Sequence, residues 1–264
     1  MRSDMICDPP RQYIGSSLRR LHLVNSTLQQ SLIQVLRITH SLEELVYELL
    51  FPDIGSKLLS TISDNIDKSL SPVQSTLQRL DFSIVLNSFD PLDDGGWNCG
   101  TMRSLVNFHR LIYLTIPSVF LLGLSAAKSK TQLADVVPPS LQRLNLTINS
   151  FDNDYWYEWT IGELVERVIM LVRGGSCGQL KAIELELPDK GPIRVLRPIP
   201  NGKFDDFDEL SDDRASQARR NVAACEKLIA DCHDGGITVE LRQLNHDLGA
   251  NGWNIFPFIY VWSL

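Results

Sequence analysis

The chain has 264 residues, of which 44% are hydrophobic and 22% are charged, and this composition excludes bulk disorder and allows one large domain or two small ones. Its formal net charge is −7 and no segment clusters lysine and arginine, so we expect no nucleic-acid partner. The chain begins MRSDMICDPP, without the apolar segment of a signal peptide, and the apolar residues 255–264 are too few to cross a bilayer. We therefore expect no membrane anchor and a cytoplasmic or nuclear location.

A leucine frame recurs along the chain. Six segments follow the order polar, Leu, any, any, Leu or Ile, any, apolar: residues 17–23, 41–47, 76–82, 110–116, 140–146 and 179–185. A weaker seventh copy passes through Ile237, Val239 and Leu241. Two copies have similar sequences over a longer stretch. Residues 76–90 align with residues 140–152, and the only gap in this alignment is the pair Val85 and Leu86. The alternative is that leucine is common and the frame arises by chance in an amphipathic chain.

The frame predicts a strand with one buried side. Alternate side chains of a strand point to opposite faces, so Leu80 and Phe82 would enter the core, as would Leu144 and Leu146. A single such strand cannot bury its apolar side alone, but stacking it beside the next copy as a parallel strand builds a shared core.

The segments between the copies supply helices, which parallel strands need as crossovers. Apolar residues with the 3.6-residue helical period occur in four of them, within residues 28–39, 54–70, 160–172 and 208–232. Pro72, Gly174-Gly175 and Gly235-Gly236 mark the ends of the last three, and Thr160 with Glu163 has the form of a capping box. The pattern predicts an α/β fold, an irregular leucine-rich-repeat solenoid with a parallel sheet on the concave side and helices on the convex side.

The predicted solenoid divides the chain into three parts. Residues 1–16 form an N-terminal lead, residues 17–190 the leucine-rich repeats, and residues 191–264 a C-terminal repeat and cap region. Within the last part, the proline-rich residues 188–200 are expected to form a loop, and the apolar, strand-like residues 255–262 to cover an open end or edge of the sheet.

One copy of the frame resembles a known family. Pro138-Pro139-Ser140-Leu141-Gln142-Arg143-Leu144-Asn145-Leu146 is similar to segments in the leucine-rich region of fungal F-box-type proteins, and the resemblance covers about residues 17–190. It implies a substrate-receptor-like role in a ubiquitin ligase pathway, in which the repeats hold a protein for ubiquitination and an N-terminal F-box motif docks to the ligase. No Leu-Pro-rich F-box start is visible among the 16 residues before the first copy.

The outward side chains of the strands would line the concave face, the usual binding surface of a solenoid. Arg20, Arg79 and Arg143 share one position of the frame and predict a basic ladder that includes Tyr113. Another protein is the expected partner, bound by Arg20, His22, Arg79, Asp81, Tyr113, Arg143, Asn145 and Glu184. The alternative, given equal weight, is a solvated sheet face whose charges serve solubility.

Two acidic, aromatic loops, residues 87–97 and 149–159, follow the twin copies. They offer the alternative function of a small-molecule enzyme or biosynthetic accessory protein, in which Asp90, Asp94 and a histidine would converge in a closed pocket. Solvated turn acids explain the same residues more simply, and we expect the rings of residues 155–159 mostly to pack on the helix that begins near Thr160. No recognised catalytic motif occurs, so we expect no enzyme activity and no cofactor.

The five cysteines suggest neither a zinc site nor a redox pair, because their spacings are scattered and no CxxC pair occurs. Cys225 and Cys232 lie seven residues apart in a predicted helix, which favours a shared place in the core over a metal site.

Overall fold

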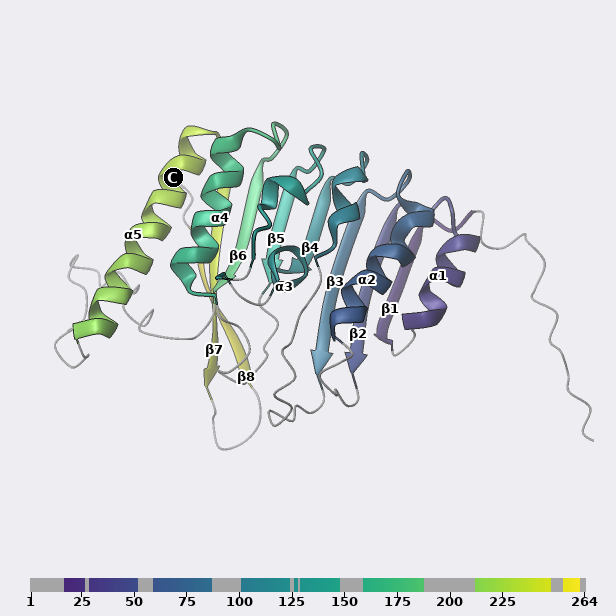
Figure 1. The fold of residues 1–264 in the computed structure, drawn as a ribbon, viewed down its shortest axis with the longest axis horizontal. Helices are drawn as coiled ribbons and strands as arrows, with labels where there is room; N and C mark the ends of the chain where they lie inside the picture. Colours follow the sequence, from purple (N-terminus) through teal and green to yellow (C-terminus); the bar gives the residue numbers. More distant parts are fainter. Residues whose placement is uncertain are drawn as a thin grey trace, which may run out of the picture.

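The copies of the leucine frame form β-strands that pair in the order in which they occur along the chain. A computed structural model of the protein describes residues 17–26, 29–51, 59–86, 101–123, 126–127, 129–147, 159–187, 212–247 and 254–261. The described strands make one sheet in sequential order, and Figure 1 shows them side by side: β1 (Arg20–Ser26), β2 (Glu44–Phe51), β3 (Arg79–Leu86), β4 (Tyr113–Pro117), β5 (Arg143–Thr147), β6 (Ala182–Leu187), β7 (Thr238–Asp247) and β8 (Asn254–Val261). The pairings from β1 to β7 are parallel, whereas β8 pairs antiparallel with β7.

Equivalent leucines of the frame occupy one row across the sheet. The register aligns Leu21, Leu45, Leu80, Leu114, Leu144, Ile183 and Val239. The row is buried from Leu45 to Val239, whereas Leu21 in the first strand is only partly buried. Each strand therefore covers the apolar side of its neighbour, as the alternation predicted.

The turn before each strand is built the same way in successive copies. A backbone N–H donates to the carbonyl of the preceding turn at Glu43, Gln78, Ile112, Gln142, Lys181 and Thr238, with N···O distances of 2.7–2.9 Å in five cases and 3.0 Å for Gln142. The polar residue that opens the frame adds a second link, since the hydroxyls of Thr76 and Ser140 donate to carbonyls of the preceding copy. The leucine that follows it is buried in every copy but the first, where Leu18 is 37% exposed.

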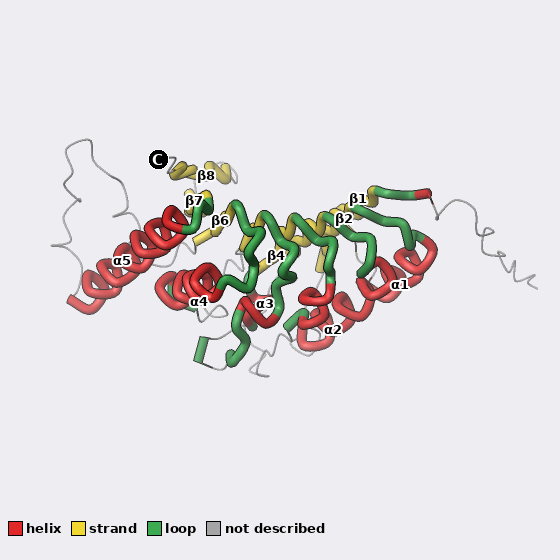
Figure 2. Tube along the Cα trace, turned by 90° about the horizontal axis from the view of Figure 1, so that it is seen from above, coloured by secondary structure: helices red, strands yellow, loops and turns green. Residues whose placement is uncertain are grey.

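The helices among the described residues all lie on one face of the sheet. They are α1 (Gln29–Ile38), α2 (Leu59–Leu70), α3 (Val119–Leu122), α4 (Ile161–Gly174) and α5 (Asp212–Asp234), with short 3₁₀ turns η2 (Ser71–Val73), η3 (Arg103–Asn107) and η4 (Leu133–Asp135). In Figure 2 the strands form the inner side of a shallow arc and the helices its outer side. The α/β class and the predicted placement of sheet and helices are thereby confirmed.

The sequence missed the short elements between β3 and β5. No helical period is visible there, because η3, α3 and η4 are three to five residues long, shorter than two helical turns. Their side chains are nevertheless central to the core: Leu105, Phe120 and Leu133 are at most 1% exposed. The conformation of these short segments is therefore set by their burial in the tertiary structure and not by a periodic pattern in their sequence.

The C-terminal expectations hold where the structure describes the chain. The weak seventh copy is β7, the last parallel strand, and the strand-like segment is β8, which pairs along its edge. The start of the helix predicted from residue 208 and the proline-rich residues 188–200 lie outside the described residues.

Helix α4 has the capping box that the sequence predicted. The Thr160 hydroxyl accepts from the backbone N–H of Glu163, and the Glu163 carboxylate accepts from the Thr160 N–H at 2.8 Å. The helix ends at Gly175, whose φ of +62° is the left-handed conformation that glycine adopts without strain.

Replacing Thr160 with alanine is expected to lower the free energy of unfolding by about 1 kcal/mol, because the N–H of Glu163 loses its acceptor. Urea denaturation followed by circular dichroism measures this difference. Thr160→Ser is the matched control and should stay within about 0.5 kcal/mol of the wild type, since serine supplies the same oxygen. Equal losses in both variants would mean that the side chain does not act as a cap.

Candidate functional site

Outward side chains of the sheet form two rows on the face away from the helices. The first row contains Arg20, Glu44, Arg79, Tyr113, Arg143, Ala182 and Thr238. The second row, two residues further along each strand, contains His22, Val46, Asp81, Thr115, Asn145, Glu184 and Glu240. All eight residues predicted to bind a partner lie in these rows, four in each.

Glu44 interrupts the predicted basic ladder. It lies between Arg20 and Arg79, and its carboxylate is 3.4 Å from the Arg20 guanidinium, 3.7 Å from that of Arg79 and 3.6 Å from the His22 ring. Charge near β1 and β2 is therefore balanced within the protein. The ladder of three arginines predicted from the sequence is an alternation of opposite charges on this side of the sheet.

An arginine, a tyrosine and a second arginine stack at the centre of the face. The guanidinium carbon of Arg79 lies 4.3 Å from the centroid of the Tyr113 ring, and that of Arg143 lies 5.8 Å from it. Both distances are in the range of cation–π attraction. We call Arg79, Tyr113 and Arg143 the Arg-Tyr-Arg cluster.

Acidic side chains lie beside this cluster on β6 and β7. Arg242 forms ion pairs with both Glu184 and Glu240, the latter at 2.9 Å. Burial raises the pKa of the Glu184 carboxyl, and the positive charge of Arg242 opposes that rise. The sequence could have indicated Glu240 and Arg242 too, because they alternate with the inward residues Val239 and Leu241.

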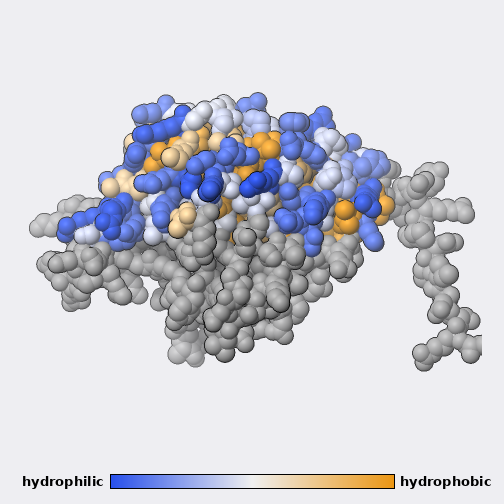
Figure 3. Space-filling view, viewed as in Figure 1, coloured by the Kyte–Doolittle hydropathy of each residue, from blue (hydrophilic) through white to orange (hydrophobic). Residues whose placement is uncertain are grey.

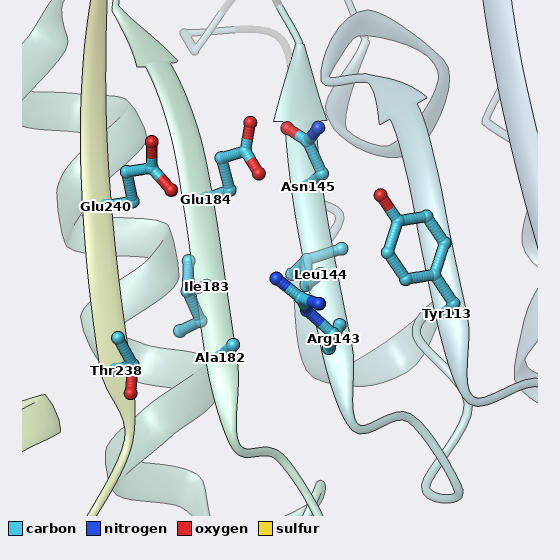
Figure 4. A pocket seen from close by; sticks show the side chains of 9 residues that line it. All are labelled: Tyr113, Arg143, Leu144, Asn145, Ala182, Ile183, Glu184, Thr238 and Glu240. Atoms are coloured by element: carbon cyan, nitrogen blue, oxygen red, sulfur yellow. The ribbon is translucent and has the colours of Figure 1, made fainter. Parts of the chain in front are cut away.

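A small pocket separates the arginine from the acids. Its lining includes Tyr113, Arg143 and Asn145 on one side and Glu184, Thr238 and Glu240 on the other (Figure 4). Its volume of about 50 Å³ is enough for a few water molecules or a carboxylate group and far below the several hundred Å³ of a typical small-molecule site. The pocket therefore suits one side chain of a larger ligand.

Several buried polar atoms on this face have no hydrogen-bond partner. They are Arg79 Nε, Thr115 Oγ1, Asn145 Oδ1, Thr147 Oγ1 and Glu184 Oε1, on β3, β4, β5 and β6. Buried polar groups are usually paired, so the occurrence of these atoms on four adjacent strands distinguishes this part of the face.

Only a small part of the two acidic, aromatic loops is described. Residues 87–97, including Asp90 and Asp94, and residues 149–158 lie outside the described residues, so the enzyme alternative stays an untested prediction. Trp159 is described, and it is 3% exposed with its ring nitrogen donating to the Gly123 carbonyl at 2.8 Å. The expectation that these rings pack is confirmed for Trp159.

The cysteines of the described segments lie in the core. Cys177, Cys225 and Cys232 are unpaired and buried, as the seven-residue spacing of the last two predicted. Burial raises the pKa of Cys225 and of Cys232 to about 12, so both are neutral thiols at physiological pH. In the part of the chain that the structure describes, no group of three or more metal-binding side chains is assembled.

The opposite, helix-covered face is mostly hydrophilic, with apolar spots that do not merge into one patch (Figure 3). Two large exposed apolar residues on these helices are Ile38 of α1 and Met170 of α4. Among the described helices, none has both the length and the apolar character needed to cross a membrane.

The fold and this face define the chain as an α/β protein with a curved parallel sheet and one polar, aromatic-centred strand face. Comparisons of the chain with protein-family models, with curated proteins and with solved structures gave no match.

Proposed function

We propose that the chain is a leucine-rich-repeat solenoid that binds another protein through the strand face. Three features support the repeat assignment: the leucine frame coincides with the strands, equivalent leucines share one row, and successive turns repeat one hydrogen-bond pattern. Stacked units of this kind present an extended concave surface, which such proteins commonly use for binding.

The Arg-Tyr-Arg cluster is the observation that carries the binding proposal. Arginine and tyrosine are over-represented among residues that dominate interface energies, because both combine a large contact area with directional hydrogen bonds. Here the three side chains lie on adjacent strands at the centre of the sheet, on the face that no described helix covers. A rigid strand platform orients them before a partner arrives, which reduces the entropy lost on binding.

The resemblance to fungal F-box-type proteins extends the proposal to one kind of partner, a protein destined for ubiquitination. This substrate-receptor-like role rests on the resemblance alone and stays a prediction.

Charge reversal on the strand face tests the proposal. The purified chain and the double variant Arg79→Glu/Arg143→Glu are used to capture proteins from an extract of the cells that make it. We expect proteins retained by the wild type to fall by about tenfold or more with the variant, because truncating or reversing central interface arginines typically costs over 1.4 kcal/mol. Mass spectrometry measures the retained amounts.

The matched control is Arg37→Glu/Lys68→Glu, which makes the same change in net charge at exposed positions on α1 and α2. It should retain the same proteins as the wild type. Equal retention by both double variants, with both folded by circular dichroism, would contradict binding through the strand face.

A further inference from the structure

We infer that two copies of the chain associate through the open edge of the sheet, with β1 of one copy pairing antiparallel with β1 of the other. The inference does not depend on the proposed function, because it concerns the end of the sheet and not the strand face. It follows from the exposure of the first repeat and from the order of side chains along β1.

Among the described residues, the first repeat lacks the apolar cover that later repeats receive from the copy before them. β1 pairs only with β2 among the described strands, whereas β8 covers the edge of β7 at the other end. Leu21 and Leu23 are only partly buried, although their equivalents in β2 are fully buried. Of the five large apolar residues that are exposed in the described segments, three belong to this repeat: Leu18, Val24 and Ile38. Terminal repeats of a solenoid usually carry a polar outer face, so an apolar one indicates a surface that another chain covers.

The outer edge of β1 also offers backbone hydrogen bonds. The Arg19 carbonyl accepts from the backbone N–H of Glu44 at 2.9 Å, so the backbone of Arg19 faces β2. Backbone groups alternate in direction along a strand, and those of Arg20 and His22 therefore point to the open edge. An edge of this kind is a template for pairing with a further strand.

The side chains of β1 occur in an order that suits a second, antiparallel copy of the same strand. When His22 of one copy lies opposite His22 of the other, Leu21 of each copy lies opposite Leu23 of its partner. The four leucines then cover one another on the helix side of the sheet. On the strand face, Arg20 lies opposite Val24, so no two arginines face each other.

This register is favoured over its neighbours. Moving the second copy by one step would place Leu23 opposite Arg19, or Leu21 opposite Asn25, and would leave two leucines without an apolar partner. The pairing of β1 with β2 is regular only as far as Leu23, so the contact is confined to the first residues of the strand.

Charge does not prevent the two histidines from meeting. The Glu44 carboxylate lies 3.6 Å from the His22 ring of its own copy, and it balances the charge of a protonated ring. A small interface of this kind is expected to form a weak dimer.

The symmetry of this pairing also fits the fold. Its two-fold axis runs perpendicular to the sheet at His22, so the helices of both copies lie on one face and both strand faces on the other. Figure 2 shows β1 and α1 together at one end of the arc, where the second copy would continue both layers. A contact that uses the same surface of both copies closes at two, so we expect a dimer and no longer assembly.

Sedimentation velocity of the full chain over a range of concentrations tests the inference. The key pair of variants is His22→Pro and His22→Ala. Proline removes the N–H that points to the open edge and leaves the pairing with β2 intact, whereas alanine keeps that N–H. We expect the wild type and His22→Ala to dimerise with rising concentration, and His22→Pro to stay monomeric where the wild type is mostly dimeric.

Val24 provides a second test that does not alter the backbone. Its side chain is 59% exposed, so replacing it should leave the fold intact. Val24→Glu places a carboxylate opposite Arg20 of the second copy and should tighten the dimer by about three- to tenfold, because the pair occurs twice. Val24→Lys places like charges opposite each other and should weaken the dimer by a similar factor.

Four results would overturn the inference. They are a wild type that stays monomeric up to about 1 mM, assemblies larger than a dimer, equal association of folded His22→Pro and His22→Ala, and equal association of the two Val24 variants. For a monomeric wild type, hydrogen exchange identifies the reason: protected amides in β1 would mean that another part of the chain covers the edge, and unprotected amides would leave it for a different protein. Protein capture from the extract tests the proposed function separately.

Discussion

Replacing Phe82 with alanine is expected to lower the free energy of unfolding by about 3–5 kcal/mol, the typical cost of emptying a buried phenylalanine site. The Phe82 ring is 1% exposed. It stacks on Tyr47 of β2 with centroids 5.8 Å apart and meets the edge of Phe120 of α3 at 5.0 Å. Removing this ring therefore removes packing contacts that join β2, β3 and α3. Because β3 also carries Arg79, the loss of these contacts would destabilise the strand face as well.

Thermal and urea denaturation measure the effect of Phe82→Ala, and a loss of about 4 kcal/mol corresponds to a fall in Tm of about 8–16 °C for a chain of this size. Met170→Ala is the control, because Met170 is 58% exposed and its truncation should change the free energy of unfolding by less than about 0.5 kcal/mol. Similar small effects in both variants would show that Phe82 does not occupy the core.

Trp159 gives the second large expected effect. Trp159→Ala should lower the free energy of unfolding by about 3–5 kcal/mol, because the buried indole joins the start of α4 to the end of α3. Trp159→Phe keeps most of the ring but leaves the Gly123 carbonyl without its donor, which should cost about 1–2 kcal/mol. Urea denaturation of the two variants separates ring packing from the hydrogen bond.

The same pair of variants tests whether Trp159 contacts a partner. If the ring serves only packing, Trp159→Phe should lower stability and leave protein capture from the extract unchanged. Weaker capture at unchanged stability would instead make Trp159 part of the binding surface.

The core and the proposed binding surface lie on opposite faces of the same strands. Along β5, Leu144 and Leu146 are buried against the helices, and Arg143 and Asn145 occur at the alternating positions on the open face. Because the two sets alternate, a variant such as Arg143→Gln changes the open face and leaves the core residues in place. This separation makes the binding experiments interpretable.

The sequence alone determined the α/β class, the strands and their inward leucines. The reason is that a period of two in a strand and a period of 3.6 in a helix are local properties, which each copy of the frame carries without reference to the others. The buried Leu80, Leu114 and Leu144 and the capping box at Thr160 were predictable on that basis.

Only the tertiary structure decided which charges on the strand face neutralise one another. The frame gives Glu44 the same position as Arg20, Arg79 and Arg143, but the short distances of its carboxylate to Arg20 and Arg79 follow from the pairing of β1, β2 and β3. Likewise, the engagement of Glu184 and Glu240 by Arg242 depends on β6 lying beside β7, across a connection of about fifty residues. Ion pairs between strands are set by distances across the sheet, which no local period encodes, and for that reason these pairs became visible only once the strands were assembled.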